Sequence, residues 1–244
     1  MMKDMSIAAI AFLAIGSSAI ATAATSPAPV NLRSAGDFVI LSKAGITNVP
    51  ASRIIGDVGT SPITGAADLL TCTEVTGLVY SVNAAGPDPC NIKDPAKLTT
   101  AILDMETAYT DAAGRTNPDF LNLRNGDIGG MRLVPGLYKF DGSVSLPTSI
   151  LLVGNENDVW IFQIAGNLTL GNAVAIDLEG GVKVHNIFWQ VAGVVTVGTT
   201  SHLQGIVLAK TVIAFKTKAS LNGRLYSQTA VTLEKNAIQQ PRIN

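Results

Sequence analysis

Acidic side chains are the residues of this 244-residue chain that could carry acid–base catalysis. Such catalysis needs two carboxylates that converge across one groove, as in enzymes that cleave polysaccharides. The main acidic residues fall at different places in the repeating pattern of the chain and form no column; they are Asp57, Asp141, Asp177 and Glu234. The sequence therefore contains no acid–base pair that indicates an enzyme.

Histidines and serines give no stronger sign of catalysis or metal binding. His185 and His202 have no cysteine or carboxylate at the spacing of a metal site. Ser42, Ser61 and Ser220 lack the strand–turn–helix context of a catalytic nucleophile. We therefore expect no catalytic residue, no metal and no cofactor.

The strongest pattern in the chain is a repeat in its last third. Residues 205–215 are echoed by residues 223–233, an offset of 18 residues (223 − 205), and the same frame continues back through 188–197, 161–170 and 137–146. A fixed period of short alternating segments indicates a stack of coils, here a β-solenoid with three strands in each coil. The fold is therefore expected to be mainly β, with about six coils.

The first segment of each coil is apolar on both faces, so its outer face needs a cover. The outward residues include Ile161, Phe188, Ile206 and Leu208. The only candidate cover is the stretch that follows Asp94, which has proline at the first helical position and apolar residues at helical spacing. We predict a long α-helix over about residues 95–113, packed on this face.

The second segment of each coil predicts a flat surface without charge. Apolar residues alternate with short residues such as threonine, serine, alanine and glycine, so the short residues point outward. Neighbouring strands place equivalent residues about 4.7–4.9 Å apart, which suits a ligand that is itself a rigid lattice. The corner and outward positions are Ala44, Gly45, Thr47, Ser143, Ser145, Asn167, Thr169, Val194, Thr196, Thr211, Val212, Ala214, Thr229, Ala230 and Thr232.

The amino-terminal part of the chain adds a coil and a cap to this arrangement. Residues 38–47 resemble residues 205–214, so at least one coil forms before the helix. Between about residues 64 and 93 the repeat is lost and glycine, asparagine and proline gather around Cys72 and Cys90. We expect a loop-rich cap there, because an uncapped solenoid exposes open strand edges.

The first residues of the chain have the pattern of a secretory signal. Lys3 precedes an apolar run over residues 7–20, and Ala21-Thr22-Ala23 offers a cleavage site of small residues. A membrane anchor is the alternative, but the run is short and Gly16 interrupts it. We expect residues 1–23 to be removed, which leaves one secreted domain over residues 24–244.

Charge content limits the possible partners, and the two cysteines suit an oxidising compartment. The net charge is −1 and only 14% of residues are charged, so no basic surface supports binding to nucleic acid. The two cysteines are expected to pair and to pin the cap, with two free thiols as the alternative.

Several short motifs of the chain resemble the secreted microbial ice-binding (antifreeze) proteins. Together they span about residues 31–239. The motifs are Asn31-Leu32 with Ala35-Gly36-Asp37-Phe38, Ile55-Gly56-Asp57-Val58-Gly59-Thr60-Ser61-Pro62, Ala108-Tyr109, Pro135-Gly136-Leu137-Tyr138, Trp160-Ile161-Phe162-Gln163 and Leu208-Ala209-Lys210.

The resemblance implies a discontinuous right-handed β-solenoid of triangular section with one long helix alongside. It also implies an ice crystal surface as the partner of a monomer that lowers the freezing point and inhibits ice recrystallisation. Some members carry a Thr-Ala/Gly-x-Thr/Asn motif on the binding face. Thr229-Ala230-Val231-Thr232 satisfies it, and Ala44-Gly45-Ile46-Thr47 departs only at its first residue. An adhesin-like or matrix module that binds carbohydrate is the second hypothesis, and a polysaccharide enzyme the third.

Overall fold

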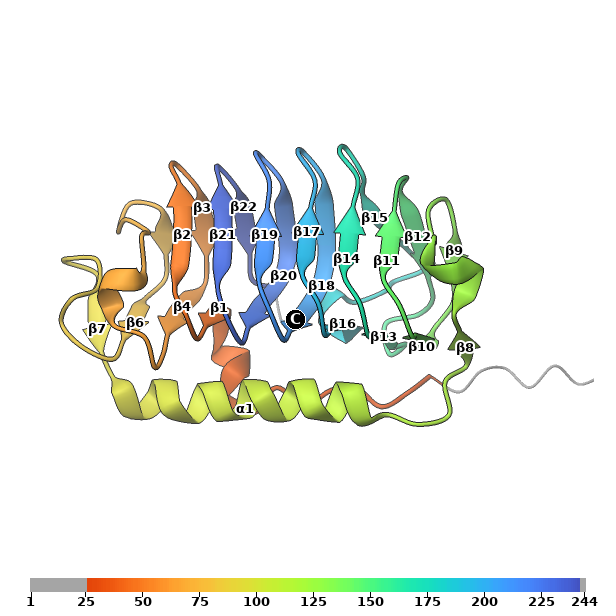
Figure 1. Cartoon of the computed structure of the whole chain (residues 1–244), viewed down its shortest axis with the longest axis horizontal. Helices are drawn as coiled ribbons and strands as arrows, with labels where there is room; N and C mark the ends of the chain where they lie inside the picture. Colours follow the sequence, from red (N-terminus) through yellow and green to blue (C-terminus); the bar gives the residue numbers. More distant parts are fainter. Residues whose placement is uncertain (1–25, 242–244) are drawn as a thin grey trace, which may run out of the picture.

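Parallel strands in three sheets, with one α-helix alongside, make up residues 26–241, the part of the chain described by a computed structural model (Figure 1). The predicted signal peptide, residues 1–23, lies outside the described residues. In residues 26–241 no helix has the length and apolar character needed to cross a membrane. The expectation of a mainly β fold with parallel strands and one long helix is confirmed.

The first sheet runs along the helix and includes both long strands of the protein. Each strand in the following order is hydrogen-bonded to the next: β7 (Asn91–Lys93), β6 (Val79–Ser81), β4 (Asp57–Thr60), β1 (Phe38–Ser42), β20 (Ser220–Ser227), β18 (His202–Ala209), β16 (Ile187–Val191), β13 (Trp160–Ile164), β10 (Gly136–Phe140) and β8 (Phe120–Leu121).

The second sheet has six strands and forms a separate side of the molecule (Figure 1). Its order is β11 (Val144–Leu146), β14 (Leu168–Leu170), β17 (Val195–Val197), β19 (Ile213–Phe215), β21 (Val231–Glu234) and β2 (Ile46–Val49).

The third side is shared between a small sheet and the first halves of the long strands. β18 and β20 turn the corner at Gly205 and Gly223, and β22 (Ala237–Gln239), β3 (Arg53–Ile55) and β5 (Val75–Thr76) continue from β20. The small sheet contains β9 (Arg132–Leu133), β12 (Ile150–Val153) and β15 (Ile176–Glu179).

The first strands of the chain lie against its last strands. β1 pairs with β20, β2 with β21 and β3 with β22, all in parallel. The coils between residues 136 and 239 therefore stack in sequence order, and the amino-terminal coil joins the stack after the last of them. The 18-residue period gives no indication of this order.

Helix α1 (Pro95–Gly114) covers the first sheet, as its sequence pattern predicts. The Asp94 side chain caps the helix by accepting a hydrogen bond from the backbone N–H of Lys97 at 3.0 Å. The buried helix residues share one apolar cluster with Ile161, Phe188 and Leu208. Ile206 is buried in the same cluster, so the predicted cover over these four residues is confirmed.

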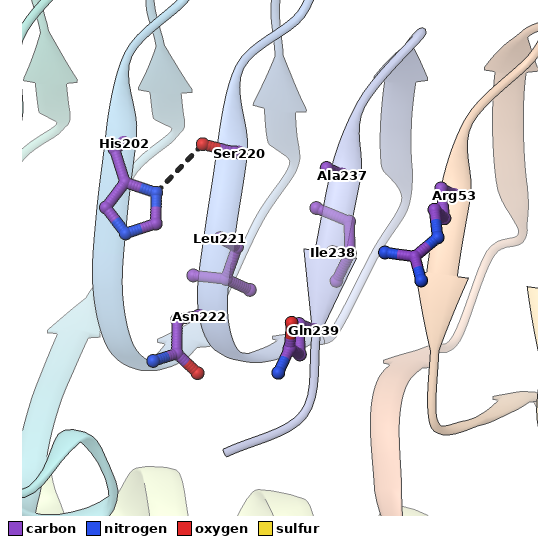
Figure 2. A pocket seen from close by; sticks show the side chains of 8 residues that line it. All are labelled: Arg53, His202, Ser220, Leu221, Asn222, Ala237, Ile238 and Gln239. Carbon is purple, nitrogen blue, oxygen red and sulfur yellow. Dashed lines mark hydrogen bonds between the residues drawn. The ribbon is translucent and has the colours of Figure 1, made fainter. Parts of the chain in front are cut away.

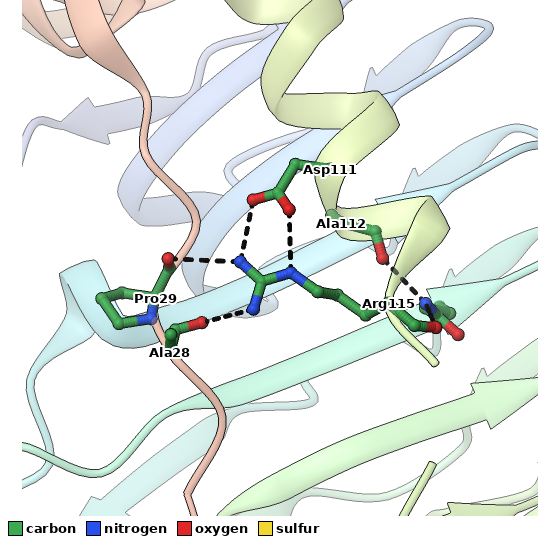
Figure 3. A network of polar contacts seen from close by, with 6 residues as sticks. Ala28, Pro29, Asp111, Ala112 and Arg115 are labelled. Atoms are coloured by element: carbon green, nitrogen blue, oxygen red, sulfur yellow. Dashed lines mark hydrogen bonds and ion pairs between the residues drawn. The ribbon is translucent and has the colours of Figure 1, made fainter. Parts of the chain in front are cut away.

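Polar contacts fix the carboxyl end of α1 (Figure 3). Arg115 holds Asp111 through two hydrogen bonds of 2.9 and 2.8 Å and also donates to the carbonyl oxygens of Ala28 and Pro29. Gln163 on β13 donates to the carbonyl oxygens of Ala112 and Arg115, each at 2.8 Å. These contacts satisfy carbonyl groups that a helix end otherwise leaves without a partner.

The interior between the three sheets contains a ladder of stacked aromatic rings. Phe120, Tyr138, Phe162 and Trp189 follow one another on β8, β10, β13 and β16, with ring centroids 4.4, 4.9 and 4.0 Å apart. The parallel register places each ring directly over the next. Because the register is the same from each strand to the next, the four rings form one continuous stack.

The cap is more regular than its sequence suggests. Residues 64–93 contain η2 (Gly65–Ala67) and the short strands β5, β6 and β7, which extend two sides of the stack. Strands of two or three residues are too short to show an alternating pattern, so the sequence predicts mainly loops. Cys72 and Cys90 form the expected disulfide within this cap. Single 3₁₀ turns occur elsewhere at η1 (Arg33–Asp37), η3 (Leu123–Gly126) and η4 (Val184–Asn186).

Candidate functional site

The outward side of the second sheet carries one straight line of small side chains. Strand pairing sets them in register from β11 to β2, one from each strand. We call this line the threonine row; it consists of Ser145, Thr169, Thr196, Ala214, Thr232 and Thr47.

The hydroxyl groups of the threonine row are free for water. Within residues 26–241, the hydroxyls of Ser145, Thr169, Thr196, Thr232 and Thr47 make no hydrogen bond to protein, whereas other serines and threonines at the corners of the coils do. Their inward neighbours, among them Leu168 and Val195, are fully buried and fix the strands beneath. The row is therefore a rigid line of hydroxyls whose hydrogen-bonding capacity is unused by the fold.

A second line runs beside the threonine row, two residues earlier on each strand. We call it the corner row: Ser143, Asn167, Val194, Val212, Ala230 and Gly45. Backbone hydrogen bonds between successive coils keep it in register, for example from Leu168 N–H to the Val194 carbonyl at 2.9 Å. Both rows lack ionisable side chains.

Two polar residues of the corner row are engaged by the next coil. Ser143 Oγ accepts a hydrogen bond from the backbone N–H of Asn167, and Asn167 Oδ1 accepts one from the backbone N–H of Val194. A side chain at Gly193 would collide with Asn167 Oδ1 and with the Gly166 carbonyl. The side-chain oxygens of Ser143 and Asn167 therefore bind backbone N–H groups at the corner, and Gly193 leaves the space that the Asn167 side chain needs.

Four of the residues proposed from the sequence differ from the rest in what they present. The hydroxyl oxygens of Thr211 and Thr229 are out of contact with solvent, so any side-chain surface that these residues expose is carbon. Gly45 is buried, because the backbone of Ala67 lies over it. Ala44 is exposed at the same corner. A repeat in the sequence does not show how the side chains of Thr211 and Thr229 rotate or that the cap covers Gly45.

Charged residues lie along the border beyond the threonine row. Lys216 and Glu234 occupy the next outward position after Ala214 and Thr232, and their side chains pair at 3.9 Å. Thr217 Oγ1 also donates to Glu234 at 2.9 Å. The uncharged surface therefore ends at this border and covers only the first two outward positions of each strand.

The third side of the molecule is neither flat nor uncharged. His202, Ser220, Asn222 and Arg53 line a shallow pocket there, and His202 Nδ1 lies 2.8 Å from Ser220 Oγ (Figure 2). Burial lowers the pKa of His202, while the nearby charge of Asp177 acts in the opposite direction. In residues 26–241 no group of three His, Cys, Asp or Glu side chains is placed to hold a metal ion.

Beyond β2 the cap continues the second sheet. Asp68 forms a parallel bridge with Ile46, although it occupies the inward position where the other coils have an apolar residue. Its Oδ1 accepts a hydrogen bond from the backbone N–H of Leu70 at 3.1 Å, and its Oδ2 is buried without a partner. A charged residue at an inward position hides the strand pattern, which is why the sequence assigns this segment to the cap.

Replacing Asp68 by asparagine is expected to stabilise the protein at pH 8 and to have little effect at pH 4. Burial raises the pKa of Asp68 from 3.8 to about 6, and the Leu70 N–H opposes this only in part. Below pH 3.8 the carboxyl is neutral in both the folded and the unfolded protein, so Asp68 does not destabilise the fold. As the pH rises through about 6 the buried carboxyl becomes charged, which lowers the free energy of unfolding by an amount on the order of 3 kcal/mol.

Asparagine keeps the acceptor for Leu70 and removes the charge. Urea unfolding of both proteins at the two pH values measures the effect. A gain in the free energy of unfolding that is the same at pH 4 and pH 8 would contradict the assignment of the penalty to a buried carboxylate.

Comparison with known proteins identifies relatives over most of the chain. Residues 40–239 match the family model described as Ice-binding-like. An ice-binding protein of Flavobacterium frigoris (strain PS1) is 58% identical over 213 residues, which cover 87% of this chain and 77% of the relative. An ice-binding protein of a Colwellia species is 52% identical over 218 residues, which cover 89% of this chain and 86% of the relative.

Solved structures agree with these relatives. A solved structure that addresses the antifreeze activity of an ice-binding protein from an Arctic yeast superposes with a TM-score of 0.82 at 41% identity. The alignment covers 88% of this chain and 96% of the yeast protein. A domain of ice-binding protein 1 of Shewanella frigidimarina superposes with a TM-score of 0.80 at 27% identity, over 89% of this chain and 99% of that domain.

Proposed function

Because this chain belongs to the ice-binding-like family, we propose that it binds ice crystals through the threonine row and the corner row of its second sheet. One observation supports this surface above the others. Five hydroxyls stand in one register line, without protein partners in residues 26–241, and the row itself contains no ionisable side chain. The helix already covers the first side, and the third side carries His202 and Arg53.

The mechanism follows from the chemistry of this surface. Each threonine presents a hydroxyl that anchors a water molecule and a methyl group around which water orders. Equivalent residues on neighbouring strands are about 4.7–4.9 Å apart, so the anchored waters form a regular layer. Charged groups would orient water differently, and they lie at the edges of the two rows, with Lys216 and Glu234 beyond the threonine row and Asp127 at its end beside Ser145. The layer can then be shared with the surface of an ice crystal.

Adsorption of the protein to the crystal surface accounts for both expected effects on ice. Ice must grow as curved fronts between adsorbed molecules, which lowers the temperature at which the crystal advances and gives thermal hysteresis. The same adsorbed molecules hinder the transfer of water from small crystals to large ones, which inhibits recrystallisation. Neither effect needs a cofactor or a chemical step, and we propose that the protein is not an enzyme.

The finer features of the fold belong to the same proposal. We propose a right-handed triangular β-solenoid of about six coils that forms a single domain over residues 24–244. The protein would be secreted after removal of residues 1–23 and would act as a monomer on ice, without nucleic acid or membrane as a partner. The alternative of an adhesin-like module that binds carbohydrate has no support among the relatives.

Replacing Ala214 by threonine tests the proposal, because Ala214 is the one member of the threonine row without a hydroxyl. The purified protein should show thermal hysteresis and faceted crystals in a nanolitre osmometer. In the Ala214→Thr variant, the concentration needed for a given hysteresis should fall by about twofold, because one more anchored water adds a fraction of a kcal/mol.

Ala237 is the matched control, since it is an exposed alanine on β22 at the third side. Ala237→Thr should leave hysteresis unchanged. Rounded crystals that grow at the melting point in the unaltered protein would refute ice binding. An equal gain in both variants would refute the choice of the second sheet.

A further inference from the structure

The cap extends the ice-facing surface beyond the coils that the repeat defines. Resting on the proposed function of the second sheet, we infer that Leu69 is a further ice-contacting residue and that it occupies the next position of the threonine row after Thr47. The parallel bridge between Ile46 and Asp68 sets this register. The backbone N–H of Leu69 donates to the Ile46 carbonyl at 2.9 Å, as expected for a seventh strand position in the same sheet.

Side-chain positions agree with this register. In the parallel bridge, Thr47 and Leu69 each follow the bridged residue and point to the same side. Leu69 is 56% exposed, whereas its neighbour Asp68 is 6% exposed and points inward. Ala67 lies over Gly45 and takes the corresponding place in the corner row. The spacing of a small corner residue followed by an outward residue two positions later is thus repeated in the cap.

The segment that carries Leu69 is held rigidly, as a surface for an ordered ligand requires. The carboxylate of Glu74 accepts hydrogen bonds from Asn48 Nδ2 at 2.7 Å and from the backbone N–H of Ser52 at 2.6 Å. It also accepts from the N–H and the hydroxyl of Thr71 at 3.0 and 2.9 Å. The disulfide between Cys72 and Cys90 follows directly. These links join the cap to the turn after β2.

Leucine suits this position because the neighbouring surface is also apolar. Val49, two residues after Thr47, is 54% exposed, so the end of the surface near the cap presents methyl groups rather than charges. The opposite end is different. Asp127 pairs with Ser145 there, is exposed and binds the backbone N–H of Gly129. The structure therefore assigns the extension to the end near the cap, and the row stops at Asp127.

Replacing Leu69 by lysine tests this assignment with thermal hysteresis as the readout. The added charge should disturb ordered water at the end of the row and lower hysteresis by about twofold to fivefold at a fixed concentration, the effect of a peripheral interface residue. Leu103→Lys is the matched control, because Leu103 is 57% exposed on the outer side of α1. Circular dichroism checks that both variants remain folded, and Thr196→Tyr tests the centre of the row in the same assay.

The outcomes separate the extension from the proposed surface itself. A loss in Leu69→Lys and Thr196→Tyr, with none in Leu103→Lys, supports the assignment. A loss in Thr196→Tyr with none in Leu69→Lys overturns the extension and leaves the proposed surface in place. An equal loss in both lysine variants overturns the extension as a general effect of charge. No loss in either Leu69→Lys or Thr196→Tyr overturns the extension and the surface together.

Discussion

Replacing Thr196 by tyrosine is expected to abolish most of the thermal hysteresis while the protein stays folded. Thr196 lies near the middle of the second sheet, in register with Thr169 on one side and Ala214 on the other. A tyrosine ring there stands above the plane of the row and keeps several neighbouring positions away from a flat crystal. Losing about three anchored waters at roughly 0.5–1 kcal/mol each would raise the concentration needed for a given hysteresis by at least about tenfold.

Thr76→Tyr provides the matched control for this change. Thr76 is an exposed threonine on β5, paired with Ile55 on the third side. The same substitution there adds the same ring to a strand that does not belong to the second sheet, so hysteresis should be unchanged. Equal hysteresis in the Thr196→Tyr variant and the unaltered protein, with both folded by circular dichroism, would show that ice contacts a different surface.

Replacing Phe162 by alanine is expected to produce the largest loss of stability, about 3–5 kcal/mol for a buried phenylalanine plus the loss of its ring contacts. Phe162 lies between Tyr138 and Trp189 in the aromatic ladder, with centroids 4.9 and 4.0 Å away. Each aromatic pair contributes about 0.5–1.5 kcal/mol beyond buried area. Urea unfolding of the variant and the unaltered protein measures the difference.

Phe215→Ala separates the stack from simple burial. Phe215 is as buried as Phe162 and lies on β19, and it takes part in no aromatic pair among residues 26–241. The cost at Phe162 should exceed the cost at Phe215 by about 1–3 kcal/mol, the sum of two aromatic pairs. Equal costs at the two positions would mean that the ladder adds nothing beyond filled volume.

The alternation of residues predicts the surface of the second sheet well. Thr169, Thr196 and Thr232 occupy the outward positions expected from a period of two, because their inward neighbours are consistently apolar. Helix α1 is predicted for the same reason, since its buried residues recur at helical spacing after a clear cap at Asp94. Both patterns are local, and each residue's neighbours along the chain determine its direction.

Features that depend on distant parts of the chain are not predictable in this way. The pairing of β1 with β20 joins Ile40 to Leu225, and no local pattern links two strands that far apart. The position of Leu69 is hidden because Asp68 replaces the apolar residue that would reveal a strand. The buried hydroxyls of Thr211 and Thr229 depend on packing at the corners. Sequence periodicity therefore identifies the threonine row but misses its end and the order of its strands.

The pairing of the first strands with the last has a consequence for synthesis and folding. Strands β1 to β7 emerge first and can pair among themselves through β4 and β6, but the open edges of β1, β2 and β3 must wait for β20, β21 and β22. During that interval the nascent protein exposes an unpaired sheet edge, the feature that most readily recruits a strand from another molecule. The carboxyl-terminal coil of a second copy would fit the waiting edge equally well. The joint that completes the fold is thus also the place where two copies would exchange halves to form a domain-swapped dimer.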